Sequence, residues 1–143
     1  MSVSPIPEGQ QSVTPYLVVH DAASLITFLQ SAFDAEEIIR HARPDGTIMH
    51  AQIKIGQSLV MMGEPMGNQQ PKPAMLHLYV DAVDNVYQNA LKAGATSIME
   101  PSDQFYGDRC SGVADKHGNT WWIASHIEDV SREEMAKRIA AAG

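Results

Sequence analysis

DQFYGDRCSGVADKHGNTWWIASH, residues 103–126, is the stretch that decides the fold of this chain. It holds a polar turn at Phe105–Arg109, a short β-prone run, a second turn at Asp115–Asn119 and an apolar run from Thr120 to Ala124. In the second turn, Asp and Asn can hydrogen-bond to nearby backbone, and Gly can adopt the positive φ of a tight reversal. Two β-prone runs bounded by turn residues predict two antiparallel strands joined as a hairpin.

The segments before this hairpin predict a strand at 74–80, a helix from about Val83 to Ala93 and a strand near 96–100. Gly94 suits the left-handed residue that ends many helices. The first half of the chain predicts the same order: a strand at 13–19, a helix at 22–33 capped by Asp21, and three strands joined by turns between residues 36 and 62. The two halves therefore read as two βαβββ units.

Spacing supports a repeat of about sixty residues, because Val19 and Gly56 recur as Val80 and Gly118 at nearly the same interval. We expect an α+β fold with module one at about 12–64, a linker at 65–73, module two at 74–126 and a C-terminal helix at 131–142. Ser131 and Glu134 form a capping box at the start of that helix. Residues 1 to about 11 are expected to be a loose arm.

Composition limits the classes of partner. The chain has 143 residues, 44% of them hydrophobic, which suits one globular domain. Ten basic against 17 acidic residues give a net charge of −7, so nucleic acid is not expected as a partner. No apolar run is long enough to predict a membrane span. The N-terminal residues lack signal-peptide features and Cys110 is the only cysteine, which together favour the cytoplasm.

The motif D-x-x-G-x-x-W at Asp115–Trp121 is followed by H-x-E-D-V-S-x-E-E-M, and other matching segments lie upstream, at 14–17, 32–37, 45–51 and 78–80. In these features the chain resembles the glyoxalase/bleomycin-resistance/dioxygenase group, the vicinal oxygen chelate superfamily, and within it the PhnB-like branch. The resemblance implies two βαβββ modules whose mixed sheets curl around a shared cavity. It also implies a homodimer.

Enzymes of this superfamily hold a divalent metal through His, Glu or Gln at four equivalent strand positions. The resemblance places those positions at Thr14, Val60, Met75 and Trp122. A divalent ion needs imidazole, carboxylate or thiolate donors, which these residues do not supply. We therefore expect no metal cofactor there, which puts lyase, dioxygenase and metal-dependent resistance activities in doubt.

Alternation along the strands places several aromatic side chains on one face of the sheet. We expect this face to bind a small hydrophobic or aromatic molecule, and ordinary core packing is the alternative. Arg109 could meet an anionic substrate at the cavity mouth or pair with Asp108 in the loop, and we favour the pair. His50 and His77 fit cavity or core histidines satisfied by their neighbours. The candidate ligand-binding residues are Tyr16, His50, His77, Tyr79, Tyr106, Arg109 and Trp122.

A second hypothesis is an enzyme of lyase or dioxygenase type that binds one divalent metal through a rearranged set. Such a set would combine His50 and His77 with a carboxylate such as Glu64 or Glu100. A third is an interaction module, which would need an exposed apolar patch.

Overall fold

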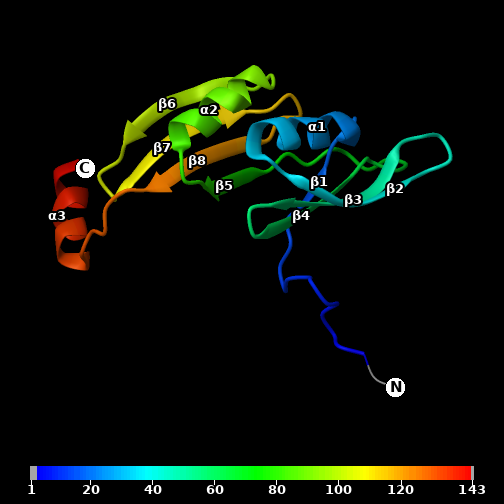
Figure 1. The fold of residues 1–143 in the computed structure, drawn as a ribbon, viewed down its shortest axis with the longest axis horizontal. Coiled ribbons are helices and arrows are strands. Elements are labelled where there is room, and N and C mark those ends of the chain that lie inside the picture. Colours follow the sequence, from blue (N-terminus) through cyan, green and yellow to red (C-terminus); the bar gives the residue numbers. More distant parts are fainter. Residues whose placement is uncertain (1–2, 143) are drawn as a thin grey trace. The chain divides into compact units, whose positions relative to one another are not determined.

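Each half of the chain folds into a four-stranded mixed sheet with a helix on one face (Figure 1). The computed structural model describes residues 3–142. Most residue contacts fall within one of two compact units, Met1–Pro73 and Ala74–Gly143. In the described part of the chain, no helix is long and apolar enough to cross a membrane.

The first unit consists of β1 (Tyr16–Val18), α1 (Ala22–Phe33), β2 (Glu36–Ala42), β3 (Ile48–Ile55) and β4 (Ser58–Gly63). Its strand order is β1-β4-β3-β2, with β1 parallel to β4 and the other pairs antiparallel. Asp21 caps α1 by accepting a hydrogen bond from the Ser24 backbone N–H at 3.3 Å, as expected from the sequence. The helix buries its apolar stripe, which includes Leu25, Ile26 and Leu29.

The second unit consists of β5 (Met75–Tyr79), α2 (Val83–Lys92), β6 (Thr96–Asp103), β7 (Asp108–Ala114), β8 (Thr120–His126) and α3 (Arg132–Ala142). Its strand order, β5-β8-β7-β6, repeats that of the first unit. The prediction of two βαβββ modules in an α+β fold is therefore confirmed, as is the hairpin of β7 and β8.

The turn between β7 and β8 is organised by the buried carboxylate of Asp115. It accepts hydrogen bonds from the backbone N–H groups of His117 (2.8 Å) and Asn119 (3.0 Å), and from the Asn119 amide (2.9 Å). The indole Nε1–H of Trp121 donates to the same carboxylate at 2.9 Å. Because neighbouring strand residues face opposite sides, holding Trp121 inside directs Trp122 to the open face of the sheet.

Three expectations about local structure are wrong. The first strand begins at Tyr16 rather than at residue 13, because Pro15 has no N–H to donate to β4, although its carbonyl accepts from the Met61 N–H. Strand β6 continues through Asp103, with breaks in its pairing register. Asp108 and Arg109 open β7 instead of lying in the turn, which is limited to residues 104–107.

The N-terminal arm is also less free than expected. The side-chain amide of Gln11 pairs with both backbone groups of Leu59, at 2.9 and 3.2 Å, as a neighbouring strand would. Gln10 donates to the Gln52 side chain at 2.9 Å. These bonds fix the end of the arm to the first sheet.

Candidate ligand pocket in the second unit

The open face of the second sheet carries a row of side chains set by strand register. His77 lies opposite Trp122, Trp122 opposite Gly112, and Gly112 opposite Met99. The other face is buried and carries Val113, Trp121 and Ile123. The sequence expectation that His77 and Trp122 share a face is confirmed by this register.

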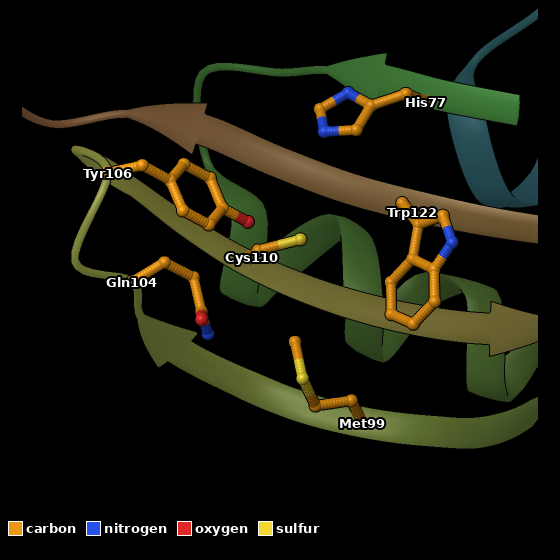
Figure 2. A pocket seen from close by; sticks show the side chains of 6 residues that line it. All are labelled: His77, Met99, Gln104, Tyr106, Cys110 and Trp122. Atoms are coloured by element: carbon orange, nitrogen blue, oxygen red, sulfur yellow. The ribbon is translucent and has the colours of Figure 1, made fainter. Parts of the chain in front are cut away.

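A pocket of about 330 Å³ lies on the open face. Figure 2 shows six side chains around it, contributed by all four strands and by the loop between β6 and β7. They are His77, Met99, Gln104, Tyr106, Cys110 and Trp122. Gly112 allows the Trp122 indole to lie close to the sheet, because a Cβ at residue 112 would stand only 2.7 Å from the indole Cε3.

The pocket lining contains no Asp, Glu, Lys or Arg. Burial raises the pKa of the Cys110 thiol, and burial also raises the pKa of the Tyr106 hydroxyl. Both groups are therefore protonated near neutral pH. The site presents an aromatic surface with a few hydrogen-bonding groups, a combination typical of small-molecule sites.

Tyr79 lies beside this pocket and belongs to a different polar group. Its hydroxyl donates to the buried Asp108 carboxylate at 2.7 Å, and its ring lies 4.8 Å from that of His77. Asp108 also contacts His126 Nδ1 at 3.0 Å, and the Nε2 of the same ring lies 2.7 Å from Asp129. Burial opposes ionisation of Asp108, but hydrogen bonds from His126 and Tyr79 outweigh it and lower its pKa. A second hollow, of about 350 Å³, is lined by Tyr79, Ser125 and His126 among others.

Arg109 points to other partners. Its guanidinium forms two hydrogen bonds with Asp84 on α2, at 2.8 and 3.0 Å, and one with Asp103 at 3.0 Å. The expected ion pair with Asp108 is wrong because the two residues are neighbours on β7 and face opposite sides of the sheet. With two carboxylates bound, Arg109 has a structural contact that ties α2 to the edge of the sheet.

The candidates from the first half of the chain meet within the first unit. The Tyr16 hydroxyl lies 3.4 Å from His50 Nδ1, and His50 Nε2 lies 3.3 Å from the Gln52 amide. These side chains stand on the open face of the first sheet, where Tyr16 pairs with Met61. They form a polar row that ends at Gln52, which accepts a hydrogen bond from Gln10.

The family's metal positions need one correction. Tyr16 pairs with Met61 in the first sheet as His77 pairs with Trp122 in the second, so Met61 rather than Val60 is the counterpart of Trp122. Val60 lies on the buried side and is 4% exposed. The corrected set of Thr14, Met61, Met75 and Trp122 still lacks the imidazole or carboxylate donors that a divalent ion prefers, so these residues do not fit the family's metal.

The rearranged metal set gains no geometric support. The Glu64 carboxylate already accepts the backbone N–H groups of Asp21 (2.9 Å) and Ile48 (2.6 Å). Residues 3–142 contain no group of three or more His, Cys, Asp or Glu placed to hold a metal ion.

A model of the Glyoxalase/Bleomycin resistance protein/Dioxygenase superfamily matches residues 10–123. The chain belongs to this superfamily. An uncharacterized protein of Mycobacterium bovis is 36% identical over 94% of this chain and 95% of its own length. An uncharacterized protein of Mycobacterium tuberculosis is also 36% identical, with 85% of its length covered.

Solved structures show the same fold at lower identity. TioX from Micromonospora is 22% identical, with a TM-score of 0.69 over 82% of this chain and 100% of its own. A PhnB protein from Bacillus cereus is 20% identical, with a TM-score of 0.65 over 80% of this chain and 99% of its own. These similarities confirm the fold expected from the sequence.

Sequence reasoning missed Met99, Gln104 and Cys110 as pocket residues. The register of β7 against β8 places Cys110 beside Ala124, on the face already assigned to Trp122. Alternation along β7 could therefore have identified it. The position of Gln104 in the pocket depends on where β6 ends, and the sequence placed that end too early.

Proposed function

We propose that this superfamily member, similar to the PhnB-like branch, binds a small hydrophobic or aromatic molecule in the pocket over Gly112, without the family's metal. One observation carries the proposal: an accessible indole, that of Trp122, stands over a glycine beside the polar groups of His77, Gln104 and Tyr106. Indole and phenol rings supply large contact area with few hydrogen bonds.

The charges around the pocket favour an uncharged or cationic ligand. The lining has no cationic Lys or Arg, and Arg109 is engaged by two aspartates. The ionised carboxylate of Asp108 accepts a hydrogen bond from the Tyr79 hydroxyl, and the Tyr79 ring lies 4.8 Å from that of His77. A net charge of −7 adds a long-range repulsion of anions. The volume of about 330 Å³ is near the lower limit for ligand pockets, which suits a small ring system.

Fluorescence titration with 1-aminoanthracene, an uncharged aromatic probe, tests the proposal. We expect saturable binding that weakens roughly tenfold or more in Trp122→Ala, because truncating an aromatic anchor removes a large part of a binding energy. Ile98→Ala is the matched control, since it removes an exposed apolar side chain from β6 outside the pocket. An equal dissociation constant for wild type and Trp122→Ala would rule out this pocket as the site.

The charge preference has its own comparison. Anthracene-1-sulfonate should displace 1-aminoanthracene more weakly than an uncharged or cationic anthracene derivative does. Stronger displacement by the sulfonate would contradict the reasoning from Asp108 and Arg109.

Metal analysis separates this proposal from the metal-dependent enzyme. We expect less than one equivalent of metal per chain after purification without chelator, and no rise in melting temperature with nickel, zinc, manganese or iron(II). A ligand that binds only the folded state raises the melting temperature, so both measurements address one question. One tightly bound equivalent, lost in His77→Ala, would instead support the rearranged site with His50 and His77.

The homodimer implied by the family resemblance and the cytoplasmic location favoured by the single cysteine belong to the same proposal. Light scattering coupled to gel filtration checks the first. The mass of a single chain would contradict it.

A further inference from the structure

The loop of residues 104–107, here called the pocket loop, contributes Gln104 and Tyr106 to the pocket (Figure 2). Internally it is held by two backbone hydrogen bonds, from Gln104 N–H to the Asp108 carbonyl (2.7 Å) and from Gly107 N–H to the Gln104 carbonyl (3.2 Å). Phe105 and Tyr106 are 42% and 38% exposed, so packing alone does not fix the loop. Its position must depend on contacts from outside.

The segment after β8 supplies the first external contact. The backbone N–H groups of Ile127 and Glu128 both donate to the Gly107 carbonyl, at 2.9 and 3.0 Å. This segment passes so close that a Cβ at residue 107 would collide with the Glu128 carbonyl. Gly107 is also at φ 103°, a conformation that favours glycine.

Arg138 on α3 supplies the second external contact. Its Nη1 donates to the Phe105 carbonyl at 2.8 Å. The same guanidinium forms a two-point bond with the Glu128 carboxylate (2.8 and 2.9 Å) and a bond from Nε to Glu134 (3.2 Å). One side chain thus joins the pocket loop, the segment after β8 and the C-terminal helix.

The helix that carries Arg138 has no other evident role in the fold of its unit. None of the residues of α3 is buried, and it lies beyond the strand ends of the second sheet (Figure 1). A helix without a buried face contributes little packing energy, since burial of an apolar face supplies most helix stability in proteins. Arg138 connects this helix to the Phe105 carbonyl and to the Glu128 carboxylate, each at 2.8 Å, and Ser131 caps it by accepting from the Glu134 N–H at 3.1 Å.

We propose that Arg138 is a positioning residue for the ligand pocket: through the Phe105 carbonyl and Glu128 it holds Tyr106 and Gln104 where a ligand meets them. The inference rests on the proposed function of this pocket. A loop that is already ordered in the free protein loses little conformational entropy when the ligand binds, so the ligand binds more tightly. Arginine suits the position because its planar group can donate to a carboxylate and a carbonyl together, which a lysine ammonium cannot reproduce.

The test compares Arg138→Ala and Arg138→Lys with Arg132→Ala. Arg132 is an exposed residue at the start of the same helix, so its substitution removes the same charge without touching the pocket loop. We expect Arg138→Ala to weaken 1-aminoanthracene binding roughly two- to tenfold, the cost of ordering a side chain on binding. Arg138→Lys should lie between Arg138→Ala and wild type, and Arg132→Ala should match wild type.

A second readout needs no ligand. Cys110 is the only cysteine in the chain, is 4% exposed and lines the pocket beside Tyr106, so its reaction with 5,5′-dithiobis(2-nitrobenzoate) reports opening of the pocket loop. We expect the reaction to be at least about threefold faster in Arg138→Ala under native conditions, because a loosened loop opens locally without global unfolding. Thermal melts of all variants separate this effect from a general loss of stability.

The outcomes distinguish the two claims. If Trp122→Ala abolishes probe binding while Arg138→Ala matches wild type in affinity and thiol reactivity, the pocket stands and the positioning role is wrong. If the probe does not bind wild type but Arg138→Ala still exposes Cys110, the proposed function fails and the hold on the loop is confirmed. Equal thiol reactivity in Arg138→Ala and Arg132→Ala overturns the inference in every case.

Discussion

Replacing Gly112 by alanine tests the contact that places Trp122 in the pocket. The new Cβ would stand 2.7 Å from the indole Cε3 and 3.1 Å from Cη2, and closer still to Cζ3. Carbon atoms in contact normally lie about 3.5–4.0 Å apart, so the indole must move by roughly 1 Å. Trp122 is half-buried on an open face, so the ring has room to move outward.

Two opposing effects set the magnitude for Gly112→Ala. Gly112 has no positive φ, so alanine fits its backbone and should by itself stabilise by about 0.4–1 kcal/mol through the unfolded state. Forcing extra volume against packed atoms costs about 1–3 kcal/mol, and the mobile ring places this case at the lower end. The net expectation is a loss of about 0.5 kcal/mol, or a melting temperature about 1–2 °C lower.

The decisive assay is a double-mutant cycle with Trp122→Ala, measured by thermal or urea unfolding. Without the indole the clash disappears, so Gly112→Ala should stabilise the Trp122→Ala background while it destabilises wild type. Neighbouring residues that touch show this kind of non-additivity. In the same experiment the affinity of wild type for 1-aminoanthracene should exceed that of Gly112→Ala. An identical, stabilising effect of Gly112→Ala in both backgrounds would refute the contact.

Two further predictions concern polar contacts in the second unit. Asp115→Asn should lower the free energy of unfolding by about 2–4 kcal/mol, because an amide cannot accept from all the donors that meet this carboxylate, including Trp121 Nε1–H. Melting curves check this prediction, and a decrease in melting temperature below 1 °C would contradict it. Hydrogen bonds to Asp129, the larger effect, and to Asp108 raise the pKa of His126. The positive charge of His126 therefore stabilises the fold fully below the ordinary pKa of about 6.5, and this stabilisation is lost as the pH rises through the higher pKa of the folded state. His126→Gln should therefore lower the melting temperature more at pH 6 than at pH 9, and an NMR titration that places the pKa of His126 below 6.5 would show the assignment to be wrong.

Local chemistry explains why so much of the fold was predictable. Asp21 and the spacing of Leu25 and Leu29 set the start and face of α1, and the structure begins and ends this helix at the expected residues. The turn at Asp115–Asn119 forms because Asp115 binds backbone groups only a few residues away. Such contacts depend on sequence neighbours alone.

Register explains several of the errors. A shift of one residue moves a strand side chain to the other face, so Val60 and Met61 could not be distinguished by counting from Gly56. Only the pairing of Tyr16 with Met61 decides between them. The same alternation separates Asp108 from Arg109, which adjacency in the sequence suggested as a pair.

The sequence by itself determined the repeated βαβββ order, the superfamily and the shared face of His77 and Trp122, because periodicity, turn chemistry and motif spacing are local properties. The tertiary structure alone decided which polar groups meet: Tyr79 with Asp108, Arg109 with Asp84, and Arg138 with the Phe105 carbonyl. These partners are 25 to 33 residues apart. Contacts across such distances depend on how strands pair and where loops close, which no local pattern encodes.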